Sequence, residues 1–521
     1  MKNTDILLIY PQLGSWDDVV RDIPLSLVYA ATHSMKNGFN VKIVDLRLHP
    51  GSWQNLIDEI LEKGCNLVGI SVMTGNPINT SLDISRYIKE KFSIPIVWGG
   101  PHPTILPEQT LENSNIDFVI RDWGSKALCE LIVHLTGGTS PIEGIEGLGY
   151  KKNDRIYLNP PQTCFEILDF NDLPYQLIDI TGSNYNRLRS GELIFPIYTS
   201  MGCPYKCNFC MSPAVYKKIA GKKWLAFDSR YVLDHMEYLA NKYEFHRFQV
   251  YDDESFVDLD RMHNLLSGYI AKGYHQKYKL DFRGARINEI DKMDDDYLRL
   301  LEKAGVELVF IGMESGSPRV LRLMNKGITV EQIIRVNRKL ARYPSIKPHY
   351  NFFCGIPGET VDDLILTKNL LLTLVKDHPG CYLGRGGHWK PIPGSVLTEV
   401  AVNNYDFKLP SSLEGWATID SRDAKPLVHP WYTPKSRKMI DLLTVTGIVL
   451  DSKAENLTGK LGRISGKFFY YLGLLYRPVL RFRLKYNFTG LFFEPLILRI
   501  FTRNIGKLLN KKASGKGYRR K

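Results

Sequence analysis

The run MGCPYKCNFC (residues 201–210) carries three cysteines, Cys203, Cys207 and Cys210, at the spacing C-x3-C-x2-C. It directly follows an apolar segment, LIFPIYTS (193–200), which predicts a strand. Three thiolates this close together can ligate one face of an iron–sulfur cluster, and such clusters usually have four cysteine ligands. Because no fourth cysteine lies nearby, one iron would be left open to a molecule other than the protein.

Two other interpretations of these cysteines are a zinc site and plain buried thiols. A zinc site would need a fourth Cys or His at the spacing of a zinc finger. His235, His246 and His263 lie downstream, but no two of them have that spacing. Free cysteines are often buried small hydrophobic residues, yet three in such a run, beside Gly202 and Pro204, rarely are. The pattern therefore favours cluster ligation.

Length and composition predict a cytoplasmic protein of several domains. A chain of 521 residues is too long for one ordinary core, so two or three domains are expected. The start of the chain has no charged segment followed by an apolar one, so no signal peptide is expected. The remaining cysteines are too scattered for a disulfide framework. They are expected in the core of a protein from a reducing cytosol: Cys65, Cys129, Cys164, Cys354 and Cys381.

Residues 1–150 predict an open, doubly wound α/β domain. Five short, nearly continuous apolar runs are typical of parallel strands buried on both faces, and the segments 24–37 and 78–92 have helical spacing. The strand candidates are 5–10, 41–46, 66–72, 94–100 and 117–122. Ligands of such sheets bind where the strands end. The residues there are Ser71, Thr74, Gly99, Gly100, Pro101 and His102. A large cofactor and ordinary turns explain them equally well, and the missing G-x-G-x-x-G disfavours a dinucleotide.

After a proline-rich connector (151–190), residues 191–405 predict a partial (β/α)6 barrel. Its strand candidates are 193–200, 246–252, 278–284, 306–312, 346–353 and 380–386. Function in βα barrels lies on the loops that follow the strands, and the cysteine loop follows the first strand. Polar groups or glycines come at or after the next strand ends: Asp253, Glu254, Arg283, Glu314, Ser315, Gly355 and Gly358. Each of these signals alone is weak, because an acid at a strand end is often a helix cap.

The motifs taken together resemble one family. The C-x3-C-x2-C run with Phe209, followed in order by DDESF, GMESGS, GIPGET and PIPGS, resembles the radical S-adenosylmethionine (SAM) enzymes, and the preceding GGPHPT resembles their cobalamin-binding class. The resemblance covers roughly residues 1–420. Two features depart from the family: the D-x-H-x-x-G motif of other B12 proteins is absent, with Asp45 and His49 at the wrong spacing, and Asp122-Trp-Gly-Ser125 replaces GEGE.

The resemblance implies three cofactors. A 4Fe–4S cluster on the three cysteines would bind SAM at its open iron, and cobalamin would lie on the loops of residues 1–150. Asp253 and Glu254 would lie near the SAM amino group, an arginine such as Arg283 would suit its carboxylate, and Glu314 with Ser315 would lie near its other polar atoms. Gly355 to Gly358 would line the adenine.

The implied activity is cleavage of SAM to a 5′-deoxyadenosyl radical, followed by methylation of an unactivated carbon. The basic, aromatic C-terminal tail favours a hydrophobic, lipid-like or tetrapyrrole-like substrate. An external one-electron reductant such as flavodoxin or ferredoxin is expected. The alternative is cobalamin-dependent oxidation or cyclisation without methyl transfer, as in the anaerobic cyclase of bacteriochlorophyll synthesis. A remote alternative is a B12 or iron–sulfur sensor with a nucleic-acid-binding tail.

The C-terminal part changes character. Residues 406–457 predict helices near the barrel mouth, and residues 458–521 a basic amphipathic tail. That tail holds sixteen Lys or Arg and one acid, so its net charge is +15 while the whole chain carries +13. Its apolar runs are too short to span a membrane, but basic and aromatic residues together favour peripheral binding to an anionic membrane surface. A docked helix is the first alternative, and nucleic acid is disfavoured. A basic stripe is formed by Arg499, Arg503, Lys507 and Lys511.

Overall fold

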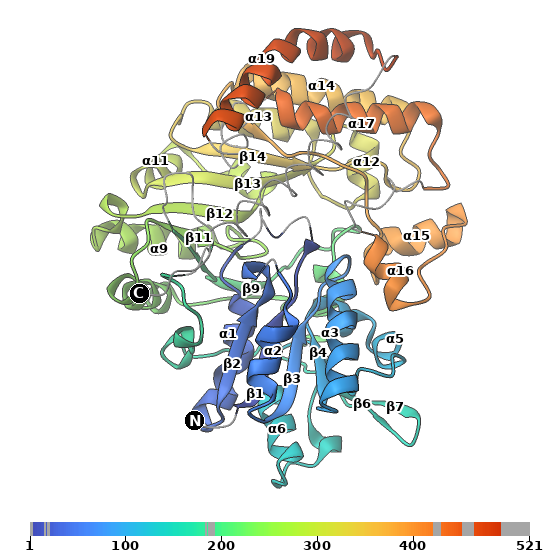
Figure 1. Ribbon diagram of the computed structural model, residues 1–521. Coiled ribbons are helices and arrows are strands. Elements are labelled where there is room, and N and C mark those ends of the chain that lie inside the picture. Colours follow the sequence, from blue (N-terminus) through green and yellow to red (C-terminus); the bar gives the residue numbers. More distant parts are fainter. Residues whose placement is uncertain are drawn as a thin grey trace.

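The computed structural model of the protein describes residues 4–14, 17, 21–49, 51–182, 185, 193–419, 429–450 and 463–490. Its two large sheets lie one below the other in the view of Figure 1, with the N-terminal sheet at the bottom. The carboxyl ends of both sets of parallel strands point toward the region between the two sheets. The C-terminal helices lie along the top and one side.

The N-terminal sheet has seven strands in the order β2-β1-β3-β4-β5-β6-β7. The first five are parallel: β1 (Thr4–Tyr10), β2 (Val41–Asp45), β3 (Cys65–Ser71), β4 (Ile96–Gly99) and β5 (Phe118–Ile120). Its helices are α1 (Leu25–Lys36), α2 (Gln54–Leu61), α3 (Pro77–Lys91), α4 (Pro101–Ile105), α5 (Pro107–Leu111) and α6 (Ser125–Leu135). Separate apolar clusters cover the two faces of the sheet. The predicted doubly wound domain is confirmed.

An antiparallel hairpin completes this sheet. It consists of β6 (Leu148–Lys152) and β7 (Arg155–Leu158), joined by Asn153 and Asp154. Both turn residues have positive φ, of 52° and 58°, as the two-residue turns that suit hairpin twist require. The first part of the connector predicted at 151–190 therefore belongs to the N-terminal sheet.

The second sheet is a parallel, open barrel of six strands in the order β15-β14-β13-β12-β11-β8. Its strands are β8 (Ile194–Ile197), β11 (Arg247–Val250), β12 (Lys279–Arg286), β13 (Val306–Glu314), β14 (Lys347–Phe352) and β15 (Tyr382–Leu383). All six lie within or overlap the predicted strands, so the partial (β/α)6 barrel is confirmed. A small hairpin, β9 (Ser200–Gly202) with β10 (Trp224–Ala226), brackets the cysteine loop.

Helices cover the outer side of this barrel sheet. They include α7 (Ser212–Val215), α8 (Ser229–Lys242), α9 (Leu259–Ala271), α10 (Ile287–Lys292), α11 (Asp295–Lys303), α12 (Pro318–Leu323), α13 (Val330–Leu340) and α14 (Val361–Asp377). A large apolar cluster joins most of them to the strands. The short α7 is an exception, since it follows the cysteine loop and contacts α4 of the N-terminal domain.

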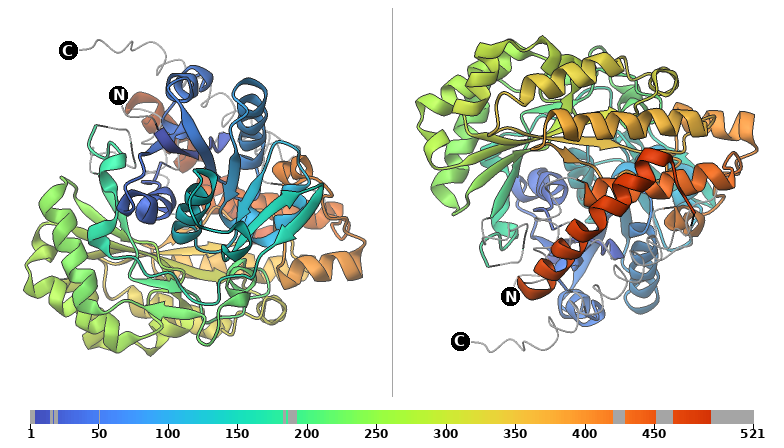
Figure 2. Two further views of the ribbon diagram at one scale, coloured as in Figure 1. Left: turned by 90° about the horizontal axis from the view of Figure 1, so that it is seen from below. Right: turned by 90° about the horizontal axis from the view of Figure 1, so that it is seen from above.

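The C-terminal helices divide between the two sheets. They are α15 (Val396–Tyr405), α16 (Leu413–Thr418), α17 (Pro434–Val449) and α19 (Arg463–Tyr486). Trp416 of α16 is buried in the N-terminal core and packs near α3, whereas α17 packs on α14 and α19 packs on α17. Figure 2 shows α19 crossing the outer surface of the barrel layer. None of the described helices is long and apolar enough to cross a membrane. The predicted basic stripe at 499–511 lies outside the described residues.

Candidate active site

The cysteine loop is fixed to the end of the neighbouring strand. The buried Asp252 carboxylate, just after β11, accepts hydrogen bonds from the backbone N–H groups of Thr199 and Ser200, at 2.7 and 3.1 Å. These two residues join β8 to the loop that carries the three cysteines. The loop therefore leaves the carboxyl end of the first barrel strand in one defined direction, as the sequence predicted.

Two of the three cysteine sulfurs receive hydrogen bonds that suit thiolate ligands. Arg286 donates from Nη1 to Cys207 Sγ at 3.1 Å, and the backbone N–H of Ser212 donates to Cys210 Sγ at 3.4 Å. Hydrogen bonds to sulfur are a normal feature of iron–sulfur sites. All three cysteines are free thiols, with Cys207 buried and Cys203 and Cys210 partly so. This donor set fits a cluster with three protein ligands.

A single metal ion is a poorer match. Among the described residues, no group of three or more His, Cys, Asp or Glu side chains is arranged around one ion. A 4Fe–4S cluster differs, because each cysteine binds a different iron. Burial raises the pKa of the Cys203 thiol, and the nearby Asp253 and Glu254 raise it further, so these acids lie close to the cysteine loop.

Asp253 and Glu254 follow β11 but face different surroundings. Asp253 accepts hydrogen bonds from the hydroxyls of Tyr216 and Ser212 at 2.9 and 3.3 Å. Glu254 is 1% exposed, and burial raises its pKa to about 8. Gly284 of β12 makes this turn possible, since a Cβ there would lie 2.2 Å from the Asp252 carbonyl oxygen.

Glu314 and Ser315, at the end of β13, have separate partners. Glu314 adopts a positive φ of 61° and forms a buried ion pair with Lys326 at 2.8 Å. A non-glycine residue in this backbone region is costly and often marks a functional site. Ser315 instead contacts the hydroxyl of Thr367 at 3.0 Å and accepts from the backbone N–H of Ser317. Its hydroxyl therefore connects β13 to α14.

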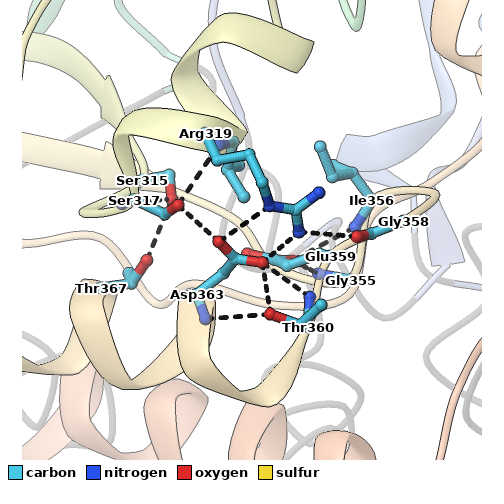
Figure 3. Close-up of polar contacts among 11 residues, drawn as sticks. Ser315, Ser317, Arg319, Gly355, Ile356, Gly358, Glu359, Thr360, Asp363 and Thr367 are labelled. Carbon is cyan, nitrogen blue, oxygen red and sulfur yellow. Dashed lines mark hydrogen bonds and ion pairs between the residues drawn. The ribbon is translucent and has the colours of Figure 1, made fainter.

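A network of charged groups holds the Gly355–Gly358 loop after β14 (Figure 3). The carboxylate of Glu359 accepts from the backbone N–H groups of Gly355 and Ile356. Arg319 donates to the carbonyl oxygen of Gly358 at 2.7 Å and pairs with Asp363. From outside the figure, the indole N–H of Trp431 donates to Gly355 O at 3.0 Å. The loop is therefore rigid, and a C-terminal residue covers it.

A cavity of about 340 Å³ lies between the two sheets. On the N-terminal side its lining is mostly apolar and comes from the sheet and from helices α1 and α6, and on the barrel side its lining includes polar groups. The N-terminal side contributes Leu8, Leu27, Gly69, Ser71, Val97, Gly99, Gly100, Asp122 and Ser125, and the barrel side contributes Tyr198, Ser200, Gly202, Tyr216, Tyr251 and Asp253.

Some of the predicted site residues line the cavity, and others do not. Ser71, Gly99, Gly100 and Asp253 line it. Thr74, Pro101 and His102 are not among the lining residues. His102 is fully buried, and its Nδ1 lies 3.0 Å from the Thr74 hydroxyl. Burial lowers the pKa of His102 to about 4, so its ring is neutral at ordinary pH. Glu254, Arg283, Glu314, Ser315, Gly355 and Gly358 also lie outside the lining.

The lining of this cavity suits part of a large cofactor such as cobalamin. Gly100, one of the lining residues, has a φ of 100°, and a Cβ there would lie 2.9 Å from Val72 O, so the chain at this strand end admits only glycine without strain. Asp122 also lines the cavity, and burial raises its pKa to about 6. Ser71 and Ser125 add hydroxyl groups. Apolar walls with a few hydrogen-bonding groups are typical of cofactor sites.

Arg283 lies apart from the cysteine loop. Its guanidinium donates to the Tyr251 hydroxyl at 3.0 Å, stacks on the Phe310 ring and lies 3.7 Å from the Asp22 carboxylate. Arg286, three residues later, makes the contact with Cys207 instead. Sequence reasoning missed this role, although the two arginines come at the end of one predicted strand. It also missed Tyr198 and Tyr216, because no motif marks the aromatic residues of a cavity wall.

The family comparisons agree with this geometry. Residues 21–132 match the family model of the B12 binding domain, and residues 197–371 match that of the radical SAM superfamily. The chain therefore carries a B12-binding domain followed by a radical SAM domain, and it is an enzyme. The cofactors of these domains are a 4Fe–4S cluster, SAM and cobalamin.

Similar proteins extend over most of the chain. An uncharacterised methyltransferase of Pyrococcus horikoshii is 27% identical over 427 residues, which cover 81% of this chain and 88% of that protein. The anaerobic magnesium-protoporphyrin IX monomethyl ester cyclase of Synechocystis is 23% identical over 326 residues, covering 61% and 62%. Among solved structures, the cobalamin-dependent SAM radical enzyme OxsB has the same fold, with a TM-score of 0.69, 18% identity and coverage of 96% of this chain and 75% of that one.

Proposed function

We propose that this enzyme is a cobalamin-dependent methyltransferase that methylates an unactivated carbon of a small molecule. The observation that carries the proposal is the cavity shared by the two domains. Ser71, Gly99 and Asp122 reach it from the B12-binding domain, while Ser200 and Asp253 reach it from the barrel, next to the cysteine loop. A cofactor held by the first domain would thus face the chemistry of the second. The methyltransferase relative supports the same activity.

The residues divide into three proposed groups. Cys203, Cys207 and Cys210 ligate the cluster. The proposed SAM contacts are Asp253, Glu254, Glu314, Ser315, Gly355 and Gly358, and the proposed cobalamin contacts are Ser71, Gly99 and Gly100. The predicted contacts Arg283, Thr74, Pro101 and His102 are left out, because Arg283 lies apart from the cysteine loop and the other three do not line the cavity. When bound, the cluster with SAM supplies a 5′-deoxyadenosyl radical, and cobalamin supplies a methyl carrier. An external one-electron reductant supplies the electron.

The chain's own groups would bind the cofactors and keep water out of the cavity. An ammonium group beside Glu254 would lower the pKa that burial raises to about 8, so the carboxylate form would be stabilised only with the ligand in place. Tyr198, Tyr216 and Tyr251 wall the cavity on the barrel side, and burial raises the pKa of all three phenols. They therefore stay neutral and can donate hydrogen bonds at any ordinary pH.

We further propose that the enzyme works on a hydrophobic substrate at an anionic membrane surface. Helix α19 supports this location. Residues 463–490 contain six Lys or Arg and no acid. Six of the thirteen exposed large hydrophobic side chains among the described residues lie on this short segment: Tyr471, Leu475, Val479, Phe482, Tyr486 and Phe488. Basic and apolar side chains on one helix are typical of helices that bind anionic lipid surfaces.

The products of SAM test the proposed activity. Methyl transfer consumes SAM in two ways, one giving S-adenosylhomocysteine and the other 5′-deoxyadenosine. We expect the anaerobically reconstituted, cobalamin-loaded protein with a reductant to form both products, measured by mass spectrometry with methyl-deuterated SAM. Cys207→Ala should form no deoxyadenosine. Formation of deoxyadenosine without S-adenosylhomocysteine would contradict methyl transfer and favour oxidation or cyclisation, the second candidate, which the similarity to the cyclase supports.

A further inference from the structure

The buried guanidinium of Arg286 is directed at the cysteine loop. Arg286 is the last residue of β12 and is 6% exposed. Nη1 donates to Cys207 Sγ at 3.1 Å, Nη2 donates to the carbonyl oxygen of Lys326, and Nε donates to Asn288 Oδ1 at 3.1 Å. The guanidinium carbon lies 3.8 Å from the ring centroid of Tyr205, another residue of the cysteine loop. Four contacts thus fix its position.

The charge of Arg286 has no direct ion pair: among the described residues, no acid pairs with it, although Lys326 beside it is paired with Glu314. The buried Glu254 carboxyl interacts with this charge from a greater distance, which lowers the pKa of Glu254 against the larger effect of burial. A buried charge is costly unless an opposite charge or a full set of hydrogen bonds compensates it. Arg286 has hydrogen bonds, but one of them goes to a thiol, which is a weak acceptor when neutral. Thiolate ligands would supply the missing negative charge.

We propose that Arg286 is a positioning residue that raises the reduction potential of the cluster. This inference rests on the proposed function, because it requires the cluster on Cys203, Cys207 and Cys210. A cluster with three thiolate ligands is anionic, and uptake of one electron from the external reductant makes it more so. A cation that donates a hydrogen bond to a ligand sulfur stabilises the reduced form more than the oxidised one. Cluster potentials are set by net charge, hydrogen bonds to sulfur and solvent exposure.

The geometry requires arginine rather than any cation. The planar fork of arginine can donate in several fixed directions, whereas a lysine ammonium is a compact charge on a flexible chain. The side chain has to reach Cys207, the Lys326 carbonyl and Asn288 together. Lysine at this position would keep the positive charge but lose some of these hydrogen bonds. The Arg286→Lys variant therefore separates the effect of the charge from that of the hydrogen bond.

The test is the midpoint potential of the reconstituted cluster, measured by redox titration with electron paramagnetic resonance. Arg286→Gln should shift the reduction equilibrium about tenfold toward the oxidised form, which corresponds to about 59 mV for one electron. Lys206→Gln is the matched control, since it removes a positive charge from the residue next to Cys207, but Lys206 is exposed. Solvent screens such a charge, so its midpoint should stay close to that of the wild type.

The outcomes separate this inference from the proposed function. If the wild type holds no 4Fe–4S cluster after reconstitution, the proposed function fails. If it does, and Arg286→Gln binds the same iron at an unchanged potential, only the role of Arg286 is overturned. If Arg286→Gln binds no iron, the same titration on Arg286→Lys decides. A midpoint below that of the wild type supports the role of the hydrogen bond, and an unchanged midpoint contradicts it.

Discussion

Glu359 is an acid whose environment opposes its charge. It is 8% exposed, and its Oε1 has no hydrogen-bond partner among the described residues, while Oε2 accepts from the Gly355 and Ile356 N–H groups. Burial, together with the nearby Asp363 carboxylate, raises the pKa of Glu359 to about 8. The folded protein therefore holds this proton more tightly than the unfolded chain does.

This raised pKa predicts a pH dependence of stability. A carboxyl with a raised folded-state pKa stabilises the fold fully at acidic pH, and this contribution is lost as the pH rises from about 4.5 to about 8. Glu359→Gln removes this titration. As the pH rises through that window, the unfolding free energy of the variant should therefore increase relative to that of the wild type by up to about 1.4 kcal/mol per pH unit. Denaturant unfolding at a series of pH values measures it. The exposed Glu244→Gln should keep the wild-type slope, and an equal slope for Glu359→Gln would contradict the account.

Some single site residues could be predicted from the sequence and others could not. Dense local motifs were informative, because C-x3-C-x2-C and the strand-end runs place several groups within a few residues of one another. Arg286 and Tyr216 could not be assigned in this way. Arg286 contacts Cys207 and Tyr216 contacts Asp253, and the two partners of each pair are far apart in the sequence. Such contacts depend on how strands are paired, which no local pattern records.

At the scale of elements, the parallel strands were predicted well and the C-terminal helices less so. Continuous apolar runs identified the five parallel N-terminal strands, because buried strands lack polar alternation. A repeating strand–helix pattern identified all six barrel strands. The place of α16 could not be predicted, since an amphipathic helix does not reveal its partner. It packs into the N-terminal core through Leu413 and Trp416, while α17 packs on the barrel.

Helix α19 carries a prediction of its own. Tyr471, Leu475, Val479, Phe482 and Tyr486 are exposed and follow helical spacing along one face, and Leu480 and Leu484 are buried on the other. We expect Leu475→Asp combined with Phe482→Asp to reduce flotation with phosphatidylglycerol-containing liposomes about tenfold or more, because each side chain loses an apolar contact worth about 1.5–3 kcal/mol.

Both positions are exposed, so the fold should tolerate the change. Ile167→Asp is the control, because Ile167 is 59% exposed and is not part of α19, and this variant should float like the wild type. Equal flotation of the double variant and the wild type would rule out α19 as the lipid-binding surface. Self-association lost in the double variant without any lipid binding would point instead to a second copy of the chain, which would also contradict the proposal.

At the scale of the molecule, residues of both sheets line one cavity. The proposed boundaries are 1–150, 151–190, 191–405, 406–457 and 458–521. The cavity between the sheets needs residues of the first and the third of these segments, and Glu166 of the second lines it as well. Glu166 also accepts hydrogen bonds from the first two N–H groups of α6, so the connector is tied to the N-terminal side of the cavity.

The most direct test is the cofactor content of the purified protein after anaerobic reconstitution with iron, sulfide and cobalamin. The account predicts close to four irons and one corrinoid per chain in the wild type, measured by iron assay and absorption spectrum. The variant with Cys203, Cys207 and Cys210 all changed to Ala should lose the iron and keep the corrinoid. A wild type that binds neither, or a triple variant that keeps its iron, would contradict the account.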